Sequence, residues 1–248
     1  MTQWGFYFDQ TRCVGCKACM LACKNWNDDR RGDYNINRDP MHPDTDWYSS
    51  GTYVVGVGQM DKASFYLNSE GETNLEQNRK YYMKEDWRRI NANERAFPYP
   101  LKYTSVACNH CTNPPCAEAC PMGIIYKEDS RGLVLVNNDT CISCGKCKDA
   151  CPWDAPQFYS PDYSNFDLDD PTRPKMTKCT MCLDRIQEGL KPACVAACFN
   201  RALDAGPIDE LRAKWSNFGK DVVEYTAMPP EDFASSSDVE PNIIFVKK

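Results

Sequence analysis

The protein carries, at residues 141–152, the run CISCGKCKDACP, in which gaps of two, two and three residues separate four cysteines and a proline follows the last. Residues 13–23 repeat this cysteine spacing in the run CVGCKACMLAC. With this spacing a tight loop can wrap three thiolates around one [4Fe–4S] cube, while the fourth cysteine follows a short helical turn and ligates a neighbouring cube. Proline ends that turn because it has no N–H to donate. The two runs therefore predict cubes that exchange ligands in pairs.

All sixteen cysteines of the protein fall into four groups of four. Group one is Cys13, Cys16, Cys19 and Cys23; group two is Cys108, Cys111, Cys116 and Cys120; group three is Cys141, Cys144, Cys147 and Cys151; group four is Cys179, Cys182, Cys194 and Cys198. Groups two and four each widen one gap, to four and to eleven residues. Because the repeat uses every cysteine, we predict four [4Fe–4S] clusters.

Disulfides and zinc are the competing uses of so much cysteine. Eight disulfides would need an oxidising compartment, yet the first nine residues, MTQWGFYFD, have neither the basic start nor the apolar core of a secretory signal. Zinc commonly binds C-x2-C pairs, so group four, with its wide gap, could form a zinc ribbon. The compact runs of groups one and three favour iron–sulfur clusters.

A predicted hairpin decides how the groups pair. Ile124–Lys127 and Leu133–Val136 are expected as short strands, and the turn-rich segment Glu128–Gly132 closes them. A two-cluster ferredoxin has such a hairpin between its cysteine groups, so we pair group two with group three, which leaves group one for group four. Spacing alone also allows group three to pair with group four.

Exchange of the fourth cysteine within each pair gives four predicted iron-binding sets, named clusters A to D. Cluster A takes Cys13, Cys16, Cys19 and Cys198; cluster B takes Cys179, Cys182, Cys194 and Cys23; cluster C takes Cys108, Cys111, Cys116 and Cys151; cluster D takes Cys141, Cys144, Cys147 and Cys120. We predict no catalytic residue, because the sequence has no phosphate-binding loop, no dinucleotide motif and only two histidines.

The expected fold class is α+β, with two ferredoxin-like [4Fe–4S] modules, a long insertion and an irregular C-terminal tail. The predicted boundaries are residues 1–27 with 175–206 for the first module, 28–100 for the insertion, 101–160 for the second module, 161–174 for a linker and 207–248 for a C-terminal helix and tail. The tail should contain a helix at Ile208–Trp215 and an apolar strand at Ile243–Val246, docked on a partner or on the protein's own sheet. Inside the insertion we expect a loop at Asn25–Asp46 and strands at Thr52–Val57, Ala63–Leu67 and Lys80–Lys84.

Charge and hydropathy exclude two classes of partner. The net charge is −6 and the isoelectric point is near 5.1, whereas a nucleic-acid binder carries a basic face. Mean hydropathy is −0.62, and no run approaches the length of apolar sequence that spans a membrane. We therefore expect no nucleic-acid partner and no direct membrane span.

Other residues near the cysteines are expected to adjust the clusters. The basic ones are Arg12, Lys17, Lys24, Lys146, Lys148, Lys178 and Arg185. Because a ligated cube is negatively charged, nearby cations lower the cost of burying it and raise its reduction potential. We predict that His110 is a hydrogen-bonding neighbour rather than a ligand, and that Trp153 packs over a cube and excludes water.

Several stretches together resemble the iron–sulfur (beta) subunit of the DMSO reductases. They are GFYFD at 5–9 with CVGCKAC at 13–19, CNHC at 108–111, ACPWDAPQ at 150–157, MTKC at 176–179, ALDAGPIDEL at 202–211 and PNII at 241–244. The stretch at 202–211 is the most diagnostic, because it contains no cysteine. Two departures are the insertion, which is longer than usual, and Phe199, which stands where a proline is common.

The resemblance implies an electron carrier in anaerobic respiration, held at the membrane by its partners. The expected partners are a large molybdopterin catalytic subunit and a quinol-oxidising membrane anchor, and the protein is either cytoplasmic or exported as a passenger of the catalytic subunit. Related nitrate reductase subunits have tryptophan at the position of Cys144, so a full four-iron cube is expected here. The alternative is a free-standing polyferredoxin that serves soluble redox partners.

Overall fold

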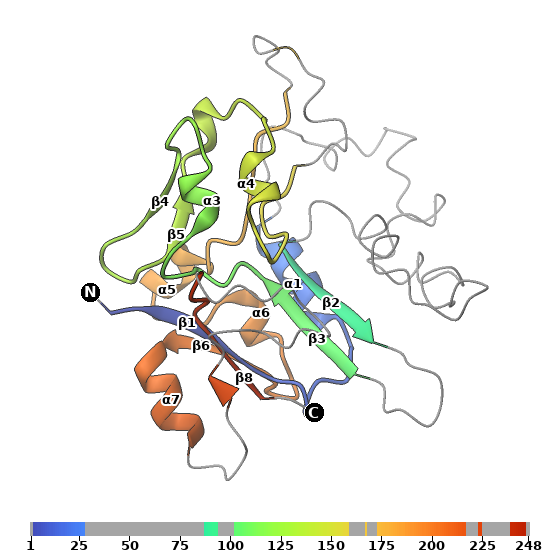
Figure 1. The fold of residues 1–248 in the computed structure, drawn as a ribbon. Helices are drawn as coiled ribbons and strands as arrows, with labels where there is room; N and C mark the ends of the chain where they lie inside the picture. Colours follow the sequence, from blue (N-terminus) through green and yellow to red (C-terminus); the bar gives the residue numbers. More distant parts are fainter. Residues whose placement is uncertain are drawn as a thin grey trace, which may run out of the picture.

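We describe a computed structural model of residues 2–27, 87–93, 102–158, 167, 173–216, 223–224 and 239–246 (Figure 1). The elements in chain order are β1 (Trp4–Asp9), α1 (Ala18–Trp26), β2 (Arg88–Asn93), β3 (Lys102–Ala107), α3 (Pro115–Glu118), β4 (Ile125–Lys127), β5 (Val134–Val136), the 3-10 turn η4 (Asn138–Thr140), α4 (Lys146–Asp149), α5 (Leu183–Gln187), α6 (Ala193–Ala196), β6 (Leu203–Pro207), α7 (Ile208–Ser216), β7 (Val223–Glu224) and β8 (Ile243–Val246). The mixture of strands and short helices confirms the prediction of a mixed helix-and-strand fold.

A four-stranded sheet in the order β6-β1-β8-β7 joins distant parts of the sequence. Strand β1 pairs antiparallel with β6, from Trp4 opposite Pro207 to Phe8 opposite Leu203. Strand β8 runs parallel to β1 on its other side. The predicted strand Ile243–Val246 is therefore confirmed, and it docks on the protein's own sheet. Strands β1 and β6 were not predicted.

Both faces of this sheet are buried, and the alternation along the strands divides them. Tyr7 faces α7, where its ring stacks on Trp215 with centroids 4.2 Å apart. Phe6, Phe8 and Phe245 face the opposite way and pack in one core with cysteines of all four groups. Helix α7, which the sequence predicted at Ile208–Trp215, covers the Tyr7 face of the sheet, and the cluster of buried side chains there contains no cysteine (Figure 1).

The predicted hairpin is confirmed as β4 and β5, which pair antiparallel from Ile125 opposite Val136 to Lys127 opposite Val134. Gly132 closes its turn at a φ of 65°, a conformation that favours glycine. The turn also reaches the large sheet, because the Trp4 N–H donates to the Arg131 carbonyl at 2.8 Å. The hairpin lies with α3 and α4, at the opposite end of the molecule from α7 (Figure 1).

A second hairpin, β2 with β3, was not predicted. Its register runs from Arg88 opposite Ala107 to Asn93 opposite Lys102. Although residues 87–93 fall in the predicted insertion, they pack against α1, where the Ile90 N–H lies 3.2 Å from the Met20 Sδ. The polar sequence RRINAN gave no strand signal, yet Ile90 is buried.

The remaining predictions concern residues that lie outside the described part of the sequence. They are the strands at Thr52–Val57, Ala63–Leu67 and Lys80–Lys84 and nearly all of the linker 161–174. The predicted loop Asn25–Asp46 starts later than expected, because α1 continues to Trp26, and its remainder is likewise outside. Among the described residues no helix is long and apolar enough to cross a membrane.

The central place of β8 gives a test of the sheet. Phe245 has 0% exposure, so Phe245→Ala should leave a cavity that costs about 3 to 5 kcal/mol and lowers the melting temperature by about 10 °C. Thermal unfolding of the anaerobic protein measures this. Leu190→Ala, at a side chain that is 48% exposed, is the matched control and should change little. Equal effects of the two substitutions would contradict the central place of Phe245.

Candidate metal centres

Three cavities of the structure are each lined by four cysteines, and their open volumes are about 350, 300 and 310 Å³. The cysteines are, in turn, Cys13, Cys16, Cys19 and Cys198; Cys108, Cys111, Cys116 and Cys151; and Cys120, Cys141, Cys144 and Cys147. Each cavity takes three cysteines from one group and the fourth from another. These are the sets predicted for clusters A, C and D. None of the three cavities combines cysteines of group three with cysteines of group four, which was the alternative pairing.

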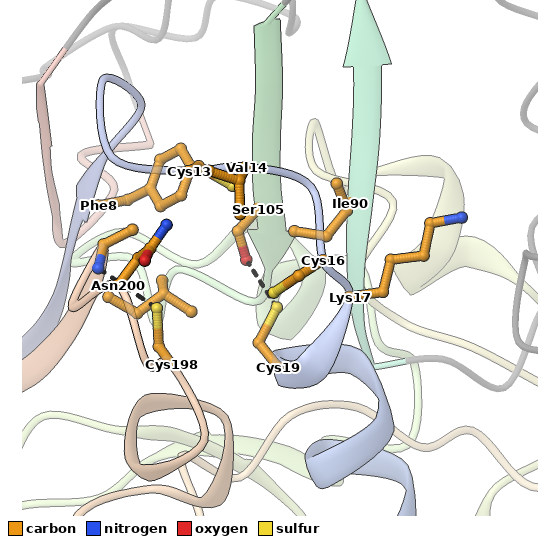
Figure 2. Close-up of a pocket in the computed structure, with 12 residues that line it drawn as sticks. Phe8, Cys13, Val14, Cys16, Lys17, Cys19, Ile90, Ser105, Cys198 and Asn200 are labelled. Atoms are coloured by element: carbon orange, nitrogen blue, oxygen red, sulfur yellow. Dashed lines mark hydrogen bonds between the residues drawn. The ribbon is translucent and has the colours of Figure 1, made fainter.

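The cavity of set A lies between the loop that follows β1 and the turn that follows α6. Figure 2 shows Cys13, Cys16 and Cys19 arranged around it, with Cys198 reaching in from the second segment. Gly15 lets the loop curl: its φ is 69°, and a Cβ there would lie 2.5 Å from the Tyr103 ring. Apolar side chains complete the lining, among them Phe8, Ile90 and Leu203.

The four cysteines of set B also lie together. Burial raises the pKa of the Cys23 thiol well above its ordinary value, and the neighbouring Cys179, Cys194 and Cys182 raise it further. The Asn27 side-chain amide spans two of the set, with its Nδ2 3.8 Å from the Cys23 Sγ and 4.0 Å from the Cys182 Sγ. These interactions bring Cys23, near the end of α1, close to the cysteines of group four.

Backbone amides donate hydrogen bonds to cysteine sulfur in several of the sets. These N–H groups are Ser143 and Met176 to the Cys141 Sγ, both at 3.4 Å, Met181 to Cys179 at 3.3 Å, Ala202 to Cys198 at 3.3 Å and Ala155 to Cys151 at 3.5 Å. An N–H aimed at sulfur stabilises the thiolate more than the thiol, so these bonds favour metal ligation.

Two buried side chains add donors around set C. The Trp153 indole N–H donates to the Cys111 Sγ at 3.4 Å, which is more specific than the packing role predicted for it. The Lys178 ammonium lies 3.8 Å from the Cys108 Sγ and donates to the Cys179 carbonyl at 3.2 Å and to that of Val134. Lys178 is 1% exposed, so its charge lies buried between groups two and four.

Other cations of the predicted set have carboxylate or aromatic partners. The Lys148 ammonium is 2.5 Å from the Asp154 carboxylate, and Arg12 pairs with Asp9 at 3.7 Å. The Arg185 guanidinium lies 4.3 Å from the centre of the Trp26 ring. A basic residue that is close to a cysteine in the sequence therefore does not necessarily interact with its sulfur.

His110 is fully buried and takes part in hydrogen bonding, as predicted. Its Nδ1 accepts the Val134 N–H at 3.1 Å, which places the proton of the neutral ring on Nε2. Burial, and then the charge of Lys178, hold the pKa of His110 well below its ordinary value. Within the described residues the Nε2 has no partner, so a buried donor is available to the sulfide of a bound cluster.

Arg88 is the functional candidate that the sequence did not reveal. It is 2% exposed, its Nη1 donates to the Ser105 Oγ at 2.9 Å, and its guanidinium lies 4.4 Å from the centre of the Phe6 ring. The Ser105 Oγ is in turn 3.9 Å from the Cys19 Sγ. Nothing in the sequence distinguishes Arg88 from its neighbour Arg89. The Arg89 guanidinium donates instead to the Trp153 and Asp154 carbonyls.

The thiols themselves fit a metal cluster. All sixteen cysteines are free, so the disulfide alternative finds no support. Burial is the largest cause that raises the pKa of Cys19, Cys116, Cys147 and Cys179 to about 12 and that of Cys151 to about 11. Such thiols keep their protons at neutral pH unless a metal replaces them.

The spacing of the ligands also bears on the metal. Among the described residues, no three cysteine, histidine, aspartate or glutamate side chains gather as the ligands of one metal ion. The cysteines line cavities instead. Four thiolates around a space, with amide donors behind them, fit a [4Fe–4S] cube, in which each thiolate binds a different iron.

Comparison with known proteins agrees with this chemistry. The family described as "4Fe-4S dicluster domain" matches residues 99–208, and that described as "4Fe-4S binding domain" matches residues 4–25. The sequence is 34% identical to the B subunit of the anaerobic dimethyl sulfoxide reductase of Escherichia coli (strain K12), over 98% of this protein and 88% of the relative. It is 29% identical to "Perchlorate reductase subunit beta" of Dechloromonas aromatica (strain RCB), over 98% and 75% of the two proteins. These relatives confirm the resemblance found in the sequence.

The Trp153 bond gives a test that concerns a single cluster. Trp153→Phe removes one donor to the Cys111 sulfur while keeping an aromatic ring. A hydrogen bond worth about 1 kcal/mol corresponds to about 40 mV for one electron, so one midpoint potential should fall by about that amount. A redox titration followed by EPR measures it.

The control for this test is Trp215→Phe, because Trp215 stacks on Tyr7 on the far face of the sheet. Its four potentials should match those of the unaltered protein. A shift of all potentials in Trp153→Phe, or none in a protein with its full iron content, would contradict the assigned bond.

Proposed function

The protein belongs to the family of iron–sulfur B subunits of the dimethyl sulfoxide reductases, and we propose that it holds four [4Fe–4S] clusters which relay electrons to or from a molybdopterin catalytic subunit. As a member of this family it is an iron–sulfur electron-transfer subunit. The observation that carries the proposal is the repeated cavity, lined three times by four cysteines from two groups.

The proposed ligands are the four sets named A to D. When bound, each cluster supplies a one-electron carrier whose potential depends on charge, hydrogen bonds and solvent around it. The residues of this protein hold each cluster, exclude water from it and donate hydrogen bonds to its thiolates. No proton transfer or bond cleavage is assigned to this subunit.

Electrostatic interactions between cysteines of different sets support a linear order of the four sets. The neighbouring pairs that interact electrostatically join A to B, B to C and C to D: Cys19 with Cys194, Cys179 with Cys108, and Cys147 with Cys116. Electrons would pass along the sets in this order or its reverse. Lys178 lies at the middle step, because its ammonium contacts the Cys108 sulfur of set C and the carbonyl of Cys179, which belongs to set B.

The sets at the two ends of this order, A and D, each have a cysteine that is exposed to solvent. Cys16 in set A and Cys144 in set D are exposed, whereas the other fourteen cysteines are buried or half-buried. Exposed apolar side chains lie beside them, Val14 and Phe199 near set A and Met122 near set D. We assign the docking of the catalytic subunit and of a membrane quinol subunit, or another donor, to these opposite ends.

The proposed location follows from these partners. The protein would be held at the membrane through the other subunits, on the cytoplasmic side or on the exported side. A free-standing polyferredoxin would instead purify without a molybdoenzyme, whereas a subunit co-purifies with one. Isolation of the protein under anaerobic, non-denaturing conditions separates these alternatives.

Metal content tests the number of clusters. The anaerobic protein should contain about sixteen iron and sixteen acid-labile sulfide per molecule, because sixteen thiolates hold four cubes. Chelation of the iron should unfold much of the protein, since metal ligation supplies part of the folding free energy and its loss leaves the cysteine-lined cavities empty. About twelve iron per molecule, or zinc in stoichiometric amount, would contradict the proposal.

Cys144 tests the carrier function at one end of the order. Cys144→Ser should convert one four-iron cube into a three-iron cluster with its oxidised EPR signal, because one iron loses its thiolate. Electron flow from quinol to the catalytic subunit should fall sharply, while turnover of that subunit with a direct artificial donor continues. Ile124→Val, which alters the lining of the same cavity without removing a thiolate or an exposed side chain of the docking end, is the control.

Loss of activity with every donor, in a Cys144→Ser complex whose catalytic subunit is still assembled and metallated, would mean that the protein does more than conduct electrons. Loss of a cube other than D would contradict the proposed ligand set.

A further inference from the structure

Arg88 is a buried cation that the proposed ligand sets leave without a role. It lies on β2 with 2% of its surface exposed. Its neighbours include the Ser105 hydroxyl, 2.9 Å from Nη1, and the face of the Phe6 ring, 4.4 Å from the guanidinium carbon. In the part of the sequence that the structure describes, its Nε and Nη2 have no hydrogen-bond partner.

Neither of these two neighbours supplies a negative charge to balance that of Arg88. A buried guanidinium is costly unless a negative group compensates it, and neither a hydroxyl nor a phenyl ring carries charge. The cysteines that act on Arg88 are Cys194, Cys179, Cys19 and Cys23, whose sulfurs become negative when they ligate a cluster. Burial by itself would lower the pKa of Arg88, but these four cysteines, once deprotonated, raise it above its ordinary value.

Helix α1 places Arg88 at the boundary of two clusters, because it carries Cys19 of set A and Cys23 of set B. Two contacts fix the position of Arg88 beside α1. Ser105 lies between the guanidinium and the Cys19 Sγ, at 2.9 Å and 3.9 Å, and the Ile90 N–H on the same strand lies 3.2 Å from the Met20 Sδ.

We propose that Arg88 sets the reduction potentials of clusters A and B, and so controls the first step of the electron route at that end. The inference rests on the proposed ligand sets. Reduction adds one electron to a cluster, and no bond forms or breaks and no proton moves. The added negative charge must therefore be compensated by fixed positive charge nearby. Arg88 provides that charge where no solvent can. It acts through the clusters and is not a catalytic residue.

The test compares three variants of the complete, anaerobically purified protein by redox titration with EPR detection. Arg88→Gln removes the charge and keeps an amide donor, so two of the four midpoint potentials should fall and two should stay. Arg88→Lys keeps the charge, and both potentials should return most of the way. The control is Arg212→Gln, which removes an exposed cation on α7 and should move none of the four.

Several outcomes would overturn the inference. They are four unchanged potentials in an iron-replete Arg88→Gln protein, an equal shift of all four, and an Arg88→Lys protein that shifts as far as Arg88→Gln. If the Arg88→Gln protein loses iron, the Arg88→Lys protein decides between charge and shape. Full iron content and near-normal potentials in Arg88→Lys support the role of charge. Loss of iron in Arg88→Lys as well would show that the shape of the side chain matters instead, and would overturn the inference. Failure of the proposed function is recognised separately, because the unaltered protein would then lack four redox-active clusters.

Discussion

Negative charge on buried sulfur is the constraint on which the arrangement of the protein depends. A thiolate removed from water needs donors and positive charge around it. The cysteine loops provide the donors through unusual backbone: Ser143 and Met181 have φ values of 55° and 58°, and each donates its N–H to the cysteine two residues before it. Left-handed backbone costs about 1 to 2 kcal/mol per non-glycine residue. Ligation of the sulfurs by the proposed clusters would offset that cost.

The sheet explains how cysteines far apart in the sequence come to share a cavity. Group one follows β1 and group four precedes β6, and these two strands pair along their whole length. The pairing continues past the strands, because the Asp9 N–H donates to the Ala202 carbonyl at 2.8 Å and the Asn200 side chain donates to the Arg12 carbonyl at 3.0 Å. The proposed exchange of Cys23 and Cys198 between sets would thus depend on ordinary strand pairing.

The sequence predicted some parts of this structure and could not predict others, for physical reasons. Cysteine spacing together with the predicted hairpin indicated which cysteines line three of the cavities, although their roles as ligands stay a prediction. The hairpin, α7 and β8 have clear turn, amphipathic or apolar patterns. Strand β1 was missed because both its faces are buried and its residues do not alternate, and β6 because LDAGP contains glycine and proline. Strand β2 was missed because Arg88, a charged residue, faces the core and its thiolates rather than water.

The parallel strand β8 has a consequence for biosynthesis. It follows every cysteine in the sequence, so the ribosome makes it only after all four groups have been synthesised. Until then β1 lacks the neighbour on one side, and Phe245 is absent from the core that packs against the cysteines. The hydrophobic core that packs against the cysteines can therefore be completed only after the last of them has been synthesised.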